Sequence, residues 1–210
     1  MFEDDRDRER FYGLLDHGVR RYDVACHQDV LMGNHVHLVL AGPIEEVSGL
    51  MWFVNGRYAV AYNRRHGRIN HLIGRRFHCS EITGPRIART VAIYVALNPV
   101  RAGLVEHPSD WSSGSYRANI GVCRPRPHVA TGAVDEAFAR IGTTLREAVE
   151  DALAAGSTGR PKLTALLPSL DELTETHVRH AQQLFGYTLD DIARHYGVSL
   201  RTLRRRLAVA

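Results

Sequence analysis

The sequence predicts an α+β protein, and three observations lead to this class. Residues 4–21 place apolar side chains along one helical face, residues 24–41 contain two apolar runs joined by a Gly-Asn turn, and the chain is helical in pattern again after residue 171. With 210 residues and 44% hydrophobic side chains, the chain can bury a substantial core. We therefore expect helices packed on a β-hairpin, followed by a helical C-terminal region.

The N-terminal elements follow from periodicity and turn residues. Helical spacing over residues 4–21 predicts a first helix, and two aspartates suit its N-terminal end. Residues 24–32 and 35–41 are the two predicted strands, and Gly33-Asn34 is the turn between them. Gly42-Pro43 ends the hairpin.

The middle of the chain predicts further helices and one short strand. We expect a helix over residues 45–65, a basic loop, a short strand around residues 76–82, and a helix from Pro85 to Asn98. Pro99 should end that helix because proline disfavours helical geometry in the residue before it. Residues 119–170 are rich in small residues and predict a linker with one helix over residues 133–155.

Positive charge is concentrated locally although the net charge is only +4. Residues 54–90 contain eight arginines and a single acid, Glu81, and Lys162 is the only lysine of the chain. Such a stretch suits a polyanion, and arginine is the better bidentate partner of phosphate. The arginines predicted to bind DNA are Arg57, Arg64, Arg65, Arg68, Arg75 and Arg76.

Cysteine content and hydropathy also indicate the cellular compartment of the protein. Cys26, Cys79 and Cys123 are odd in number and far apart, so a disulfide framework is not expected and a reducing compartment fits. No signal peptide and no apolar run of about 18 residues is visible. The sequence thus predicts a cytoplasmic protein without a membrane partner.

His35 and His37 are the candidate metal ligands. They lie two residues apart on a predicted strand, so both imidazoles project from one face. A His-x-His pair alone is also common among ordinary surface histidines. A metallo-hydrolase is a further alternative, but such sites usually carry an aspartate two residues on, where Val39 stands here.

Tyr94 is the candidate nucleophile. On a helix, Tyr94 and Asn98 share one face, so that a phenol and an amide oxygen can serve one metal-centred site. Oxygen ligands beside imidazole favour Mg²⁺ or Mn²⁺. A tyrosine among valine and isoleucine is also typical of a core, so the pattern alone leaves both interpretations open.

Several motifs in order resemble the single-tyrosine HUH transposases, most closely the REP-associated tyrosine transposase branch. The similarity covers residues 1–118 and is carried by MGNHVHLVL at residues 32–40, by NGRY and YNRRHG within residues 55–67, by YVALNPVRAGLV at residues 94–105, and by DWSS and SYRA within residues 110–118. Recurrence of several motifs in order is more specific than any one of them.

The resemblance implies a fold, a reaction and roles for residues. It implies a ferredoxin-like antiparallel sheet with helices, His35 and His37 as metal ligands, Asn98 at the position of the third ligand, and Tyr94 as the nucleophile. The implied substrate is single-stranded DNA folded into hairpins, nicked and rejoined through a 5′-phosphotyrosine. A bacterial cytoplasm and a monomer are implied too, with a dimer left open.

The sequence departs from the family at its start. The family's first strand precedes the helix that starts here near Asp4, and the printed residues leave no room for it. We therefore expect an exposed sheet edge beside the metal site. This departure keeps a second hypothesis open, in which the chain is a transposase-derived DNA-binding protein without catalysis.

Residues 171–210 predict a separate C-terminal helix-turn-helix. Thr188 and Asp191 form a capping-box-like start, Gly197 supplies the turn, and Ser199 caps the second helix. That helix carries Arg201, Arg204 and Arg205, which we expect to contact duplex DNA. A plain helical hairpin is the alternative.

Overall fold

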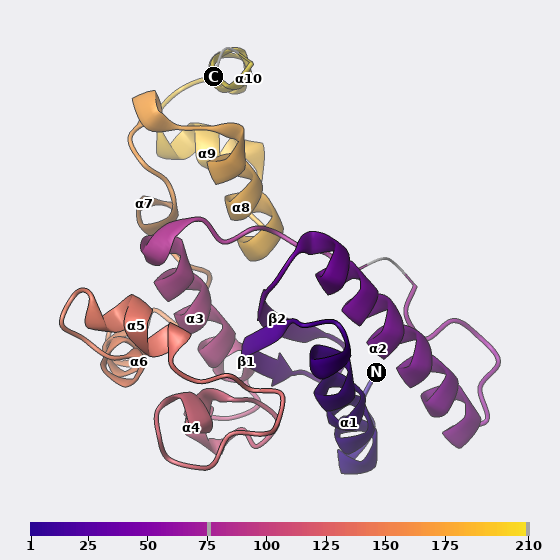
Figure 1. Cartoon of the computed structure of the whole chain (residues 1–210). Helices are drawn as coiled ribbons and strands as arrows, with labels where there is room; N and C mark the ends of the chain where they lie inside the picture. The colour runs from indigo at the N-terminus through magenta and orange to yellow at the C-terminus, as the bar shows by residue number, and fades with distance from the viewer. Residues whose placement is uncertain (75–76, 209–210) are drawn as a thin grey trace.

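The computed structural model describes residues 1–74 and 77–208. A β-hairpin lies at the centre, with α1 and α2 on one side and α3 on the other (Figure 1). The C-terminal helices α8, α9 and α10 extend beyond one end of α3. The predicted α+β class is confirmed.

The N-terminal helix and the hairpin form as the sequence predicts. Helix α1 spans Asp5–Arg21, and the side chain of Asp4 caps it by accepting a hydrogen bond from the Asp7 backbone N–H. Strands β1 (Ala25–Leu31) and β2 (Val36–Ala41) pair antiparallel, with Val30 opposite His37.

The two edges of this sheet differ. The second edge of β1 is occupied, because Leu31 N–H donates to Ser113 O at 2.8 Å and Ala130 N–H donates to Cys26 O at 2.8 Å. Among the described residues no strand pairs with the outer edge of β2. The exposed edge expected from the sequence is therefore present, while the larger ferredoxin-like sheet is not seen in the described part of the chain.

One hydrophobic cluster joins α1, the hairpin and helix α2, which spans Ile44–Arg65. Phe2, Phe11 and Tyr58 pack ring against ring, with centroids 5.3–5.5 Å apart. The helices pass closely at Gly18, where an added Cβ would meet the Leu50 side chain at 2.5 Å. This cluster covers one face of the sheet.

Helix α3 spans Gly84–Arg101 and covers the other face. The prediction that Pro99 ends this helix is wrong, because α3 continues to Arg101 through it. Pro99 lies in the last turn, where a missing N–H costs a single helical hydrogen bond, and both Asn98 and Pro99 are buried. Packing therefore outweighs the local preference.

Two other local predictions fail. Residues 77–82 form no strand, and Arg76, where that strand was to start, lies outside the described residues. The single helix expected over residues 133–155 is two helices, α5 (Ala133–Ala139) and α6 (Leu145–Ala154). Gly142 breaks them with a φ of +69°, and Thr144 starts α6 with a capping box.

Helices α5 and α6 are part of the core. Phe138 and Val149 are buried against Ala92, Ala96 and Leu97 of α3. The helical part of the segment predicted as a linker thus packs along α3.

The C-terminal helices also pack on α3. A third hydrophobic cluster runs from Val30 and Val91 to Phe185, Ile192 and Leu203. The remaining elements are two single 3₁₀ turns (Pro108–Asp110 and Leu170–Glu172), α4 (Tyr116–Asn119), α7 (Leu163–Leu166), α8 (Glu175–Phe185), α9 (Leu189–His195) and α10 (Leu200–Leu207). Among the described residues, no helix combines the length and apolar character needed to cross a bilayer.

Candidate active site

The two histidines of the predicted metal pair lie on the α3 face of the hairpin. Val36 and Leu38 of β2 pack into the hydrophobic cluster that joins α1, the hairpin and α2. Val39 packs into the cluster that joins the hairpin to α3 and the C-terminal helices. Because side chains alternate along a strand, His37 points toward α3. His35 immediately precedes β2, and its ring centroid lies 4.9 Å from that of His37. The sequence prediction that both imidazoles share one face agrees with this geometry.

Tyr94 reaches the same place from α3. Its ring centroid is 5.7 Å from that of His37, at an interplanar angle of 87°. The Tyr94 ring also contacts Phe185 of α8 edge-on at 5.0 Å, and the Arg101 guanidinium carbon lies 4.4 Å from its centroid. The tyrosine is half-buried between a histidine, a phenylalanine and an arginine.

Asn98 completes the group. It is 6% exposed, and its Nδ2 donates to the Tyr94 carbonyl oxygen, one turn earlier, at 2.8 Å. Its side chain also lies within hydrogen-bonding reach of His37. The hydrogen bond with Asn98 raises the pKa of His37, so the amide oxygen of Asn98 is the accepting atom and faces the imidazole.

The environment keeps His37 neutral. Burial lowers its pKa to about 4, repulsion from His35 and Arg101 acts in the same direction, and the Asn98 hydrogen bond opposes them. Partial burial also lowers the pKa of His35. Both rings are therefore neutral near pH 7, which is the form that ligates metals.

A hydrogen bond orients the ring of His35. Its Nδ1 lies 2.7 Å from Oδ1 of Asn34, and an amide oxygen can only accept. With Nδ1 as the donor, the Nε2 lone pair of His35 is free. The Gly-Asn turn thus orients His35 so that Nε2 is the nitrogen that can coordinate a metal.

His35, His37 and Asn98 are the side chains here that could hold a metal ion. Within the described ranges, no group of three or more His, Cys, Asp or Glu side chains is placed to hold a metal ion. Two neutral imidazoles and one amide oxygen do meet here, which fits a divalent cation that takes its other ligands from DNA phosphate or water.

The arginines of α2 do not gather beside Tyr94. Arg57 and Arg64 line a groove on the outer surface of α1 and α2, across the sheet from α3. Arg65 lines the same groove but pairs with Asp7 at 2.5 Å and with Asp4, which ties the two helices together. Arg68 lies over the Tyr62 ring at 5.9 Å, and Arg75 and Arg76 fall outside the described residues.

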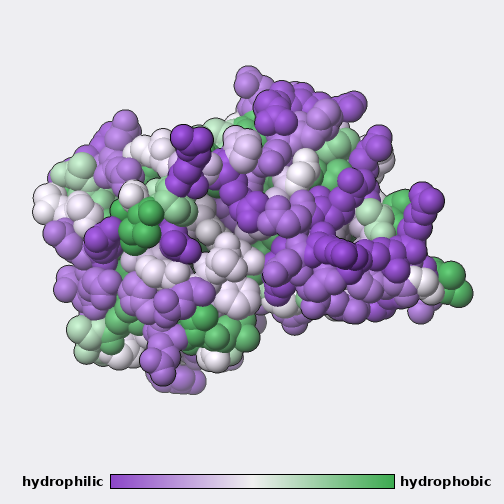
Figure 2. Space-filling view, turned by 90° about the horizontal axis from the view of Figure 1, so that it is seen from below, coloured by the Kyte–Doolittle hydropathy of each residue, from purple (hydrophilic) through white to green (hydrophobic). Residues whose placement is uncertain are grey.

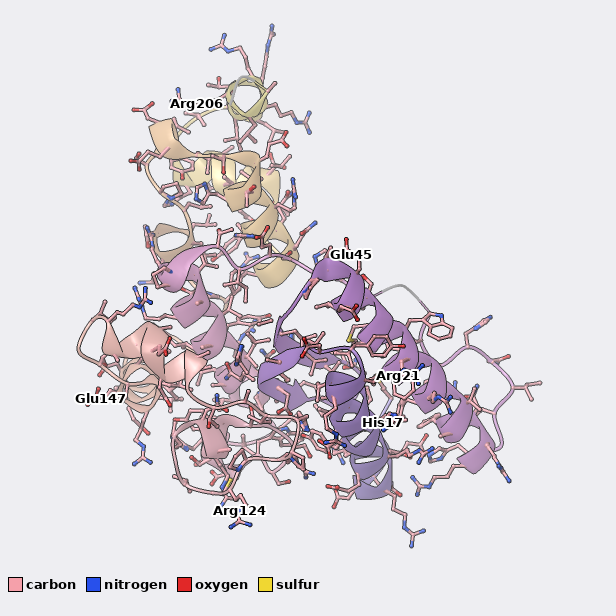
Figure 3. All side chains as sticks on the ribbon, viewed as in Figure 1. His17, Arg21, Glu45, Arg124, Glu147 and Arg206 are labelled. Carbon is pink, nitrogen blue, oxygen red and sulfur yellow. The ribbon has the colours of Figure 1, made fainter. Side chains whose placement is uncertain are left out.

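The C-terminal arginines are exposed on α10. Arg201, Arg204 and Arg205 face solvent, while Leu203 is fully buried. Ser199 caps α10 by accepting from the Thr202 N–H at 3.1 Å, as the sequence predicted. Figure 3 labels their neighbour Arg206, whose guanidinium pairs with Asp171 at 2.5 Å.

Two residues of the site are not among those predicted from the sequence. Arg101 lies two turns after Tyr94 on α3, so its i+7 spacing was a usable signal. Phe185 reaches Tyr94 from α8, 91 positions along the chain, and no periodicity links such distant residues.

A second group of polar side chains, centred on one histidine, lies against the opposite face of the hairpin. The His128 ring is buried between Asp16, at 2.5 Å from Nδ1, and Asp29, at 3.4 Å from Nε2. Tyr12 donates to the second oxygen of Asp29 at 3.2 Å and stacks on His128 at 5.4 Å. Burial lowers the pKa of His128, but the hydrogen bonds and charges of both carboxylates outweigh burial, so the net shift is upward.

Comparisons of this chain with family models, with curated proteins and with solved structures find no match.

Proposed function

We propose that this protein nicks and rejoins single-stranded, hairpin-forming DNA with Tyr94 as the nucleophile. The observation that carries the proposal is the meeting of His35, His37, Asn98 and Tyr94, from the hairpin and α3, at one place. A structural tyrosine needs no pair of neutral imidazoles and no cation beside its ring. The resemblance of the motifs around these four residues to single-tyrosine HUH transposases supports the same conclusion.

The reaction is a transesterification. The phenol oxygen of Tyr94 forms a bond to the phosphorus, and the bond from phosphorus to the 3′ oxygen breaks. The phenol gives up one proton and the leaving 3′ oxygen takes up one, which leaves a 5′-phosphotyrosine and a free 3′-hydroxyl. The covalent link stores the phosphodiester, so the strand is resealed without ATP.

Residues of this chain position the reacting groups. Arg101 places a positive charge 4.4 Å from the centroid of the Tyr94 ring, where it attracts the scissile phosphate. Asn98 holds the helix turn that carries Tyr94. His35, His37 and Asn98 would hold Mg²⁺ or Mn²⁺, which supplies charge stabilisation at the phosphate when bound.

The test is formation of a covalent protein–DNA adduct. The protein is incubated with Mn²⁺ and a pool of 5′- and 3′-labelled hairpin oligonucleotides with randomised single-stranded flanks, and adducts are resolved under denaturing conditions. We expect an adduct from the wild type and none from Tyr94→Phe. Tyr116→Phe is the matched control, because the buried Tyr116 hydroxyl has no hydrogen-bond partner among the described residues. An equal adduct from Tyr94→Phe contradicts the proposal.

A DNA-binding protein without catalysis is the second candidate. The observation in its favour is that Phe185 and Arg101 pack against the Tyr94 ring and leave it half-buried. The outer edge of β2 beside His37, unpaired within the described residues, favours it as well. Wild-type protein that binds the hairpin pool as tightly as Tyr94→Phe, with no adduct from either, supports this candidate.

We propose in addition that α9 and α10 act as a helix-turn-helix that binds duplex DNA. The exposed Arg201, Arg204 and Arg205 on one short helix support this role. Replacing all three by alanine should weaken duplex binding and flatten its log–log salt dependence by about 0.9 per lost phosphate contact. An unchanged salt slope contradicts it.

A further inference from the structure

A groove on the outer surface of α1 and α2 lies across the sheet from Tyr94. It has a volume of about 850 Å³, and its wall includes Arg10 and Arg21 from α1 and Arg57 and Arg64 from α2. Along α2 it extends from Trp52 to Arg64, about 18 Å at the helical rise per residue. Figure 2 shows the molecule from below, where hydrophilic side chains cover most of the surface and hydrophobic groups form small separate patches.

An exposed tryptophan lies in this groove. Trp52 is 79% exposed, so folding leaves a large aromatic surface in water. Its neighbour Phe53 is buried, and two guanidinium groups lie over its ring. The guanidinium carbon of Arg57 is 5.3 Å from the ring centroid, and that of Arg21 is 5.6 Å from it. Arg21, labelled in Figure 3, thus reaches from α1 toward α2.

The arginines of the groove keep most of their charge free. Of the five that line it, only Arg65 makes an ion pair among the described residues, with Asp4 and Asp7. No acidic side chain is part of the lining, and the first-turn acids Glu45 and Glu46 of α2 lie outside it. The groove is therefore a cationic surface with an exposed aromatic ring.

We propose that this groove binds single-stranded nucleic acid, with a base stacked on Trp52 and backbone phosphates held by Arg10, Arg21, Arg57 and Arg64. Arginines that track a backbone, combined with an aromatic platform for bases, are the features by which single strands are bound without sequence preference. A duplex offers no unstacked base to Trp52. A second copy of the chain fits less well, since a twofold contact would bring the two sets of unpaired arginines together.

The binding test keeps the groove separate from the chemistry of Tyr94. Binding is measured by fluorescence anisotropy in EDTA, with a 20-nucleotide oligothymidylate and with the duplex of the same length as probes. Because no cleavage is possible under these conditions, the result does not depend on the proposed function. In a Trp111→Phe background, Trp52 is the sole tryptophan, and its fluorescence reports stacking directly.

We expect tight binding of the single strand, weaker binding of the duplex, and quenching of Trp52 on addition of oligothymidylate. Trp52→Ala should weaken single-strand binding on the order of ten-fold, and Trp52→Phe should restore most of it. Arg57→Ala and Arg64→Ala should each flatten the log–log salt dependence by about 0.7. Arg20→Ala is the charge control, because Arg20 is exposed on α1 but lies outside the groove.

Two outcomes overturn the proposal. Wild-type affinity of Trp52→Ala for oligothymidylate, without quenching in the Trp111→Phe protein, shows that the groove does not bind the strand. A wild-type dimer that Trp52→Ala converts to a monomer in sedimentation shows that the groove is a protein interface instead.

Discussion

Two histidines flank the hairpin from opposite faces, and their surroundings are opposite in charge. His37 faces α3 with a second histidine, an arginine and an amide nearby, and its pKa is lowered to about 4. His128 lies between Asp16 and Asp29, and its pKa is raised. The first ring is neutral near pH 7, whereas two carboxylates favour the protonated form of the second.

The difference separates a candidate ligand site from a structural ion pair. A neutral imidazole without a carboxylate partner keeps a nitrogen that can ligate, whereas an imidazole paired with two carboxylates holds segments of the chain together. His128 joins residues near 128 to α1 and to β1. The comparison predicts that substitutions on the α3 face change activity, and that those on the α1 face change stability.

The largest effect is expected from His37→Ala. Loss of one candidate metal ligand should reduce adduct formation by at least about 100-fold and leave the free energy of unfolding nearly unchanged. The measurement is the adduct assay together with urea denaturation. His17→Ala, at an exposed position on α1, is the control. Full activity in His37→Ala would contradict a role for His37 in the reaction.

Asp29→Asn should act on stability instead. The Asp29 side chain is 1% exposed and bonds to both His128 and Tyr12, so removing its charge leaves a buried imidazolium without one partner. Breaking such a buried pair costs about 3 kcal/mol of unfolding free energy. Urea denaturation measures the loss, with Asp5→Asn at a 94% exposed side chain as the control. Equal stability of the two variants would contradict the structural role.

The pH dependence of stability should further distinguish His128 from His37. Because the folded pKa of His128 is raised above the unfolded value near 6.5, its contribution is complete below pH 6.5 and is lost as the pH rises through the raised pKa. Unfolding free energy should therefore decrease over that window. His128→Gln should remove this decrease, and an unchanged pH profile in the variant would assign the titration to another group.

Much of the framework could be predicted from sequence because it depends on local periodicity. The first helix, the hairpin with its Gly-Asn turn, and α2 all have patterns that span only a few residues. Pro99 shows where local rules stop, since burial against the core keeps it helical. The split of α5 from α6 at Gly142 was hidden by small residues of good helical propensity on both sides.

Local sequence patterns likewise predict some of these functional and structural residues and miss others. His35, His37, Tyr94 and Asn98 belong to short motifs, so strand alternation and helical spacing bring each pair onto one face. Phe185 and His128 reach their partners from 91 and 99 positions away, and only the tertiary fold brings them there. Trp52 is ordinary in sequence, and its significance lies in being left exposed among arginines.

The most direct test of Tyr94 as the nucleophile is peptide mapping of the protein–DNA adduct. After nuclease trimming of the DNA and tryptic digestion, the peptide of residues 90–101 contains Tyr94 as its only tyrosine. We predict that mass spectrometry finds a nucleotide phosphate on this peptide, with fragment ions that place it on Tyr94. A nucleotide on any other tyrosine-containing peptide, or its absence from residues 90–101, would contradict the account.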